Sequence, residues 1–221
     1  MMNLLQLAAI CAAIGGHAPA PPQGTDCVAV GQQYRVALAR IAPELETRQG
    51  RNAIARVAYA EAGNQGDDGL AAVVYTIVNR VLDGNFGASL TAVLNAPGQF
   101  APVRHAGGRW KALPAVSPVK QAHIDTILNL ALEGRLPDPT NGALYFRSAS
   151  GVADRAGQIP VAVVKDHAFF ARSSQALERS LDQASAVGAP DTVDPTALAQ
   201  TSSDTPVRIP AVPAVPRLGD Q

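Results

Sequence analysis

One glutamate, Glu61, falls at an unusual place in an amphipathic helical pattern. Ile54, Val57 and Ala58 recur at the i, i+3 and i+4 spacing of one helix face, and Glu61 follows at i+7 on the same face. An ionised carboxylate on an apolar face costs several kcal/mol unless it is paired or protonated. A carboxyl that stays protonated near neutral pH suits a general acid. The alternative, a glutamate that turns into solvent at the helix end, is favoured by periodicity alone because buried glutamates are uncommon.

Other kinds of catalytic chemistry find less support in the sequence. The four histidines are scattered and form no His-Glu-x-x-His motif, so we expect no metal site. The Gly-x-Ser-x-Gly motif of serine hydrolases and the glycine-rich loops that bind phosphate are also absent, and no cofactor is suggested. A carboxylic acid acting on a glycosidic bond is therefore the simplest chemistry that remains.

The two cysteines, Cys11 and Cys27, do not indicate a nucleophile. Asp26-Cys27 is similar to the start of the motif of the NlpC/P60 cell-wall cysteine peptidases, but no strand followed by His-Val-Gly completes it. We interpret Cys27 as non-catalytic. A disulfide between the two is conceivable only if the N-terminal segment is retained, and the sequence does not require it.

Two helices must position Glu61. Arg51–Ala62 forms the first, and Gly63 is expected to end it. The second is the cleanest amphipathic pattern in the chain; it begins near Leu70, with Asp67 or Asp68 as its cap, and ends at Asp83-Gly84. Tyr75 and Asn79 are i, i+4 neighbours on its flank, where they either line a groove or form hydrogen bonds within a packed surface.

The remaining pattern predicts an α+β domain with helices first and a small antiparallel sheet last. We expect further helices at Gly31–Ile41, Pro43–Arg48 and Ser89–Asn95, and from Ser117 to Gly134. Strands are expected at Ala143–Phe146, Val161–Val164 and Ala168–Phe170.

Between these elements, Gly98–Pro114 reads as a long irregular segment, and long loops in compact domains are often functional. It holds Trp110, the only tryptophan in the chain. This side chain either stacks on a sugar face or anchors the loop in the core.

Both ends of the chain differ from the middle in amino-acid composition. Met1–Ala20 has a short apolar run followed by Ala18-Pro19-Ala20, as in a secretory signal peptide, although no Lys or Arg precedes the run. We expect export to the periplasm or the exterior, with a mature start near Pro21. The alternatives are an N-terminal helix packed on the domain, or an uncleaved weak anchor of a phage lysis enzyme. The run is too short for a standard transmembrane helix.

Residues 173–221 are rich in Pro, Ala, Ser, Thr and Asp and contain no aromatic residue, which predicts a flexible tail. Removing residues 190–221 should leave the melting temperature nearly unchanged. A loss of several degrees would show that the tail packs on the domain or holds the chain in an assembly.

Composition limits the partners. The chain has 221 residues, with 18 Lys and Arg balanced by 18 Asp and Glu. No net charge points to nucleic acid or an anionic membrane. We divide the chain into a leader (1–20), a helical lead-in (21–50), a catalytic domain (51–172) and the tail (173–221).

Four segments, taken in order, resemble the cell wall hydrolases related to the spore-cortex-lytic enzyme SleB. The first is the run from Ala58 to Val81, AYAEAGNQGDDGLAAVVYTIVNRV, in which a helix ends in Glu-Ala and a longer one in Asn-Arg. Gly98-Gln99-Phe100, the run from Asp138 to Phe146, and the run from Lys165 to Phe170 follow. The resemblance covers roughly residues 51–171.

The resemblance implies a lysozyme-like fold and cleavage of peptidoglycan glycan strands between N-acetylmuramic acid and N-acetylglucosamine. Glu61 corresponds to the family's catalytic glutamate, and residues in the matching segments are expected to bind glycan or hold Glu61: Gln99, Asn141, Tyr145 and His167. A lytic transglycosylase is favoured because it needs only one carboxyl group. The alternatives are a hydrolytic muramidase of phage origin, with Asp138 or Asp166 as second carboxylate, and a non-catalytic wall-binding or virion protein.

Overall fold

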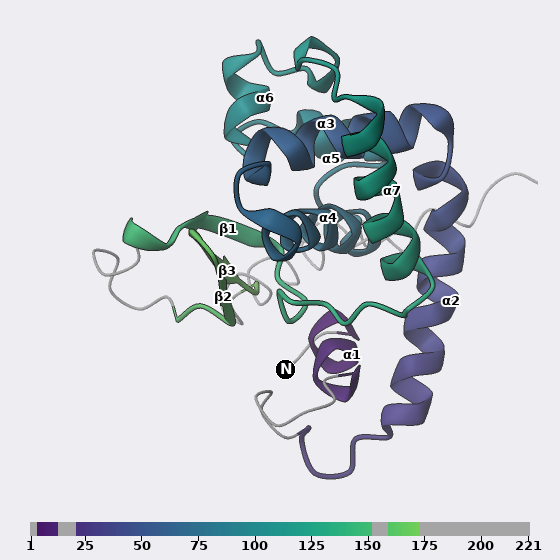
Figure 1. Cartoon of the computed structure of the whole chain (residues 1–221). Coiled ribbons are helices and arrows are strands. Elements are labelled where there is room, and N and C mark those ends of the chain that lie inside the picture. The colour runs from purple at the N-terminus through teal and green to yellow at the C-terminus, as the bar shows by residue number, and fades with distance from the viewer. Residues whose placement is uncertain (1–3, 13–20, 152–158, 173–221) are drawn as a thin grey trace, which may run out of the picture. The chain divides into compact units, whose positions relative to one another are not determined.

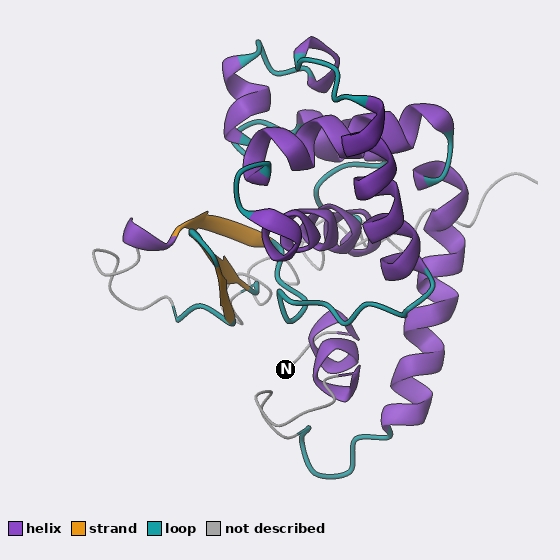
Figure 2. Cartoon of the chain, in the orientation of Figure 1, coloured by secondary structure: helices purple, strands orange, loops and turns teal. Residues whose placement is uncertain are grey.

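The computed structural model describes residues 4–12, 21–151 and 159–172 (Figure 1). The helices are α1 (Leu4–Ala12), α2 (Cys27–Leu45), α3 (Arg48–Ala62), α4 (Gly66–Asp83), α5 (Leu90–Asn95), α6 (Ala101–His105) and α7 (Pro118–Leu132), with 3₁₀ turns η1 (Trp110–Ala112) and η2 (Ala149–Gly151). The strands are β1 (Tyr145–Ser148), β2 (Ala162–Val164) and β3 (His167–Phe170). Helices thus dominate and a small sheet follows them, which confirms the predicted α+β class (Figure 2).

Helix α4 is the central element of the core. Every residue from Gly69 to Arg80 is buried, including those off the predicted apolar stripe. The helix packs against α3, α7, α2 and α5, and its contacts extend to β2. A helix buried on all sides carries small or apolar residues all round, which the run of Ala, Val and Ile supplies. It therefore fixes the end of α3, where Glu61 lies, relative to the sheet.

The helix starts confirm the predicted beginnings of two helices at Ser89 and Ser117 and correct the predicted cap of α4. The Ser89 and Ser117 hydroxyls accept backbone N–H groups at the starts of α5 and α7. Asp67 and Asp68 do not cap α4, which begins after Gln65 without a side-chain cap. They lie instead in its exposed first turn, where acidic side chains favour the helix dipole. Asp67 contacts His123 at 2.9 Å and Asp68 contacts Lys165 at 3.0 Å.

Two predicted boundaries are wrong. The segment expected to form two helices near Ile41 is the continuous helix α2, which contains Pro43 close to its C-terminal end. Asp26 caps its start by accepting the N–H groups of Val28 and Ala29. The segment 98–114, expected to be irregular, contains α6 and η1, which are too short to show a helical period in the sequence.

The sheet has the strand order β1-β3-β2, with antiparallel pairs throughout. Its strands begin and end within two residues of the predicted positions. Phe146 of β1 lies opposite Phe169 of β3, and both rings pack toward buried residues of the helical part. The register therefore turns one aromatic face of the sheet toward the helices.

The N-terminal segment carries a helix that packs on the domain. Leu5, Ala8, Ala9 and Ile10 of α1 are buried, and a disulfide joins Cys11 to Cys27 at the start of α2. A cysteine in a disulfide is not a free nucleophile, which removes the cysteine-peptidase alternative. None of the helices in the described residues has the length and apolar character needed to span a bilayer.

The proposed cleavage site at residues 18–20 lies outside the described residues, as does the tail, so both expectations remain predictions.

A pair of glycines tests the docking of α1. Gly142 and Gly134 both have left-handed backbones, with φ of 73° and 68°. A Cβ on Gly142 would lie 2.6 Å from the Leu5 backbone, whereas one on Gly134 meets open space. Both alanine variants carry the left-handed penalty of about 1 kcal/mol, and Gly142→Ala should lose roughly 2 kcal/mol more to the clash. Urea unfolding measures this difference. Equal losses would contradict the packing of α1, and the difference should vanish in a chain that lacks residues 1–20.

Candidate active site

Glu61 lies in the last turn of α3, on the same helix face as the buried residues Ile54, Val57 and Ala58. Its side chain remains partly exposed. One carboxyl oxygen accepts a hydrogen bond from the backbone N–H of Ala101, the first residue of α6. The other, Oε1, is buried and has no partner among the described residues. The predicted position on the apolar face of α3 is therefore confirmed, and one carboxyl oxygen is left without a hydrogen-bond donor among the described residues.

Burial raises the pKa of Glu61 to about 7. The Ala101 N–H and the positive charge of Arg80 lower the pKa but do not offset the loss of water. At neutral pH a substantial fraction of this carboxyl is therefore protonated. The group can donate a proton and, once ionised, accept one.

Arg80, near the end of α4, is a cation whose charge lowers the pKa of Glu61. It is not among the site residues predicted from the sequence. Its side chain is 2% exposed, and its Nε donates to the Leu144 carbonyl at 2.7 Å. Burial lowers its pKa to about 10, so it remains charged at neutral pH. The available signal was a single arginine within an otherwise buried apolar helix.

Three aromatic rings surround the Arg80 guanidinium. Its central carbon lies 4.7 Å from the ring centre of Phe100, 5.1 Å from Phe86 and 5.7 Å from Phe146. The π faces attract the cation and replace part of its lost hydration. The Nη1 atom is buried without a partner in the described residues. The aromatic cage thus holds a fixed positive charge whose field reaches Glu61.

Two of the predicted site residues border this aromatic cage. The His167 ring packs edge-on against Phe146 at 5.0 Å, and burial lowers its pKa, so it is mainly neutral at pH 7. The Tyr145 ring lies 5.4 Å from Phe86 and is 39% exposed. The structure thus brings β1 and β3 to the same cluster as Arg80 and Glu61.

The other two predicted site residues, Gln99 and Asn141, differ in their position relative to the site. Gln99 directly precedes Phe100, one of the three rings of the cage, and Ala101, whose N–H donates to Glu61. Its backbone therefore lies next to the site. Asn141 instead donates from Nδ2 to the Val161 carbonyl at 2.8 Å and ties its loop to the sheet. One N–H of its side-chain amide is therefore already used within the protein.

Asp138 is the centre of a hydrogen-bonded loop. Its carboxylate accepts from Asn79 Nδ2 at 3.0 Å, from the Thr140 N–H and hydroxyl at 2.8 and 2.7 Å, and from the Gly142 N–H at 2.9 Å. Four donors leave little capacity for a substrate. Asn79 and Tyr75 are both buried, and the Tyr75 hydroxyl donates to the Leu136 carbonyl. The hypothesis that Tyr75 and Asn79 line a groove is therefore wrong.

Trp110 does not offer a sugar-stacking surface. Its side chain is 4% exposed, and its backbone N–H donates to Asn95 Oδ1 at 2.8 Å. It anchors the segment between α6 and α7 in the core, so the stacking alternative is wrong. Within residues 4–12, 21–151 and 159–172, no group of three or more His, Cys, Asp or Glu side chains is arranged to hold a metal ion.

The raised pKa predicts how Glu61 affects stability. Because its folded pKa, about 7, exceeds the ordinary 4.5, the carboxyl costs no stability below about pH 4.5, and the cost grows up to pH 7. Glu61→Gln should therefore match the wild type near pH 4.5. Near pH 8 it should be more stable by about 1–2 kcal/mol, a figure reduced for partial exposure. Urea unfolding at both pH values measures this. A variant no more stable at high pH would show that Glu61 ionises freely.

Comparison with known proteins identifies a family. Residues 64–170 match the model of the cell wall hydrolase family. No curated protein and no solved structure matches significantly. The matched region contains Arg80, Gln99, Asn141, Tyr145 and His167, and it starts three residues after Glu61. Residues 64–170 of this chain are thus a domain of the cell wall hydrolase family.

Proposed function

We propose that this protein is a lytic transglycosylase that cleaves peptidoglycan strands between N-acetylmuramic acid and N-acetylglucosamine, with Glu61 as its acid and base. The observation that carries the proposal is the half-buried Glu61 carboxyl, which has a pKa of about 7 and one unpartnered oxygen. The family domain that begins beside it supports a wall glycan as substrate.

The proposed reaction uses Glu61 twice. The protonated carboxyl first gives its proton to the glycosidic oxygen, and the bond from that oxygen to the muramic anomeric carbon breaks. The carboxylate then takes the proton of the muramic 6-hydroxyl, whose oxygen attacks the same carbon and closes an anhydro ring. The proton count balances and Glu61 is again protonated. Arg80 stabilises the carboxylate between the two steps through its fixed positive charge.

The environment of the other acids favours this reaction over hydrolysis. A hydrolytic muramidase usually needs a second carboxylate across the bond. Asp138 is occupied by four donors within its own loop. Asp166 is exposed at the turn between β2 and β3, where its backbone N–H donates to Gln65. Asp166 is therefore the stronger candidate if the enzyme is a muramidase.

We further propose that the protein acts outside the cytoplasm. Peptidoglycan lies there, and the Cys11–Cys27 disulfide favours an oxidising compartment. A phage lysis enzyme or virion component meets the same conditions, and the tail is the segment available for assembly. A non-catalytic wall-binding protein is disfavoured by the raised pKa of Glu61, since pure binding does not require a protonated carboxyl.

A zymogram tests the proposed function. The full chain, separated in a gel that contains peptidoglycan and then refolded, should clear a band at its own mass. Clearing should be lost in Glu61→Gln, and the same gel with a glycan that lacks muramic acid, such as chitin, should stay opaque. A wild-type band that never clears would contradict the enzymatic proposal.

A further inference from the structure

A hollow lies away from Glu61, between the first half of α3, η1 and the start of α7. It has a volume of about 830 Å³, within the range of ligand sites. Asn52, which lines it, precedes Glu61 by nine residues, so the two project from opposite faces of α3. The hollow is therefore separate from the site around Glu61.

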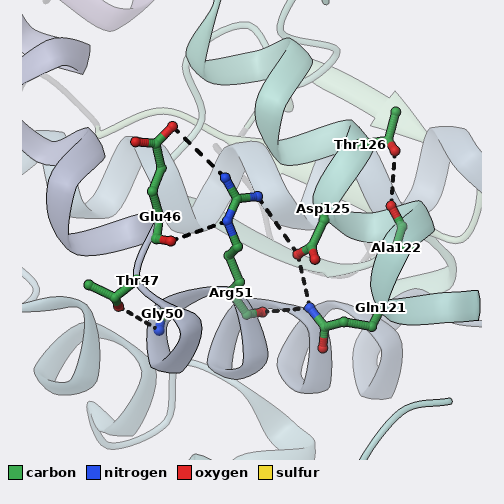
Figure 3. A network of polar contacts seen from close by, with 8 residues as sticks. All are labelled: Glu46, Thr47, Gly50, Arg51, Gln121, Ala122, Asp125 and Thr126. Atoms are coloured by element: carbon green, nitrogen blue, oxygen red, sulfur yellow. Dashed lines mark hydrogen bonds and ion pairs between the residues drawn. The ribbon is translucent and has the colours of Figure 1, made fainter. Parts of the chain in front are cut away.

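Its lining carries unbalanced positive charge. Arg51 is neutralised by Glu46 and Asp125, each at 3.9 Å, in the network that Figure 3 shows. Arg48, Arg56 and Lys111 also line the hollow, and none of the ion pairs in the described part of the chain involves them. Because the whole chain has no net charge, three unpaired cations at one hollow are a local feature of the surface.

The same lining holds hydrogen-bond donors without acceptors. The Arg56 guanidinium is fixed by the carbonyls of Lys111 and Leu113, at 3.2 and 2.9 Å, and lies over the Trp110 ring at 5.9 Å. Arg56 Nε and Trp110 Nε1 are buried and lack acceptors in the described residues. Unsatisfied buried donors are costly, and the oxygens of an anion would satisfy groups of this kind.

We propose that this hollow binds a carboxylate of the peptide stems of peptidoglycan. The choice of ligand rests on the proposed function, because the sugars of the strand are uncharged and its anionic groups are the stem carboxylates. Neutral sugar is a poorer fit, since Trp110 is buried and the free groups are cations and donors. The hollow thus gives the enzyme a contact with the wall beyond the scissile bond.

The single tryptophan makes this proposal measurable, because Trp110 lines the hollow and its fluorescence reports occupancy. The probe is a synthetic stem tetrapeptide with free carboxylates, titrated into the full chain. Arg48→Glu/Lys111→Glu should weaken its binding about tenfold or more. The control Arg35→Glu/Arg40→Glu makes the same charge change at exposed positions of α2 and should bind like the wild type.

Three results of the peptide titration would overturn the proposal. These are wild-type binding that is absent at millimolar peptide, equal binding of the peptide with all carboxylates amidated, and equal binding by the Arg48→Glu/Lys111→Glu variant. Preferential binding of a glycerol-phosphate polymer would also overturn it, since the site would then serve phosphate. The assay needs no catalysis. A chain that binds the peptide but clears no peptidoglycan would therefore refute the proposed function alone.

Discussion

Glu61→Gln should lower the rate of peptidoglycan cleavage by about a hundredfold or more, the usual scale for losing acid–base catalysis. Glutamine keeps the shape of the side chain and can still accept from the Ala101 N–H, but it has no proton to give to the glycosidic oxygen. The fold should persist, because the substitution also removes a buried ionisable group. Release of soluble muropeptides from purified walls measures the rate.

The matched control for this experiment is Glu133→Gln. Glu133 is exposed and pairs with Arg135 at 3.0 Å, far in sequence from the site, so its loss should leave the rate unchanged. Circular dichroism shows whether both variants are folded. A folded Glu61→Gln protein that digests walls near the wild-type rate would make the catalytic assignment wrong.

Arg80→Met should lower turnover by about tenfold to a hundredfold, because the charge that stabilises the Glu61 carboxylate is lost. It should also move the pH profile in a defined direction. Arg80 lowers the pKa of Glu61, so without it that pKa rises above about 7 and Glu61 stays protonated to higher pH. The alkaline limit of activity should therefore shift upward even as the maximum rate falls.

Arg80→Lys separates this electrostatic role from packing. Lysine keeps the positive charge but cannot fill the aromatic cage or reproduce the planar contact with Leu144. The alkaline limit should remain near that of the wild type, while stability and rate fall moderately. If Arg80→Met and Arg80→Lys lose the same activity without any shift of the pH profile, Arg80 acts through structure alone.

Helical periodicity predicted the parts of the fold that depend on local sequence. The face of α3 that carries Glu61, the end of α4 at Asp83 and the starts of α5 and α7 beside Ser89 and Ser117 all follow from residue types and spacing within a few turns. The parts of the fold that were predicted wrongly depend on contacts between segments far apart in the sequence. Trp110 is buried where α6 and η1 pack on α3, and α2 continues through Pro43 to Leu45, which is fully buried. Neither outcome is visible in a local window.

The candidate site was only partly predictable for the same reason. Glu61 was identified because its placement conflicts with its charge, a conflict that the sequence itself displays. The role of Arg80 depends on Phe86, Phe100 and Phe146, which come from three separate segments and meet only in the fold. Asn141 lies in a family-like segment, yet its side chain holds the sheet. Position within a family-like segment therefore did not distinguish a residue of the site, such as Arg80, from a structural residue, such as Asn141.

Mass spectrometry of the muropeptides that the wild-type protein releases tests the central claim most directly. If Glu61 alone supplies acid and base, the products should end in anhydromuramic acid, one water lighter than the hydrolytic products, and Glu61→Gln should release neither kind. Reducing muramic ends from the wild type would contradict the transglycosylase and point to a muramidase that activates water, with Asp166 the first carboxylate to replace.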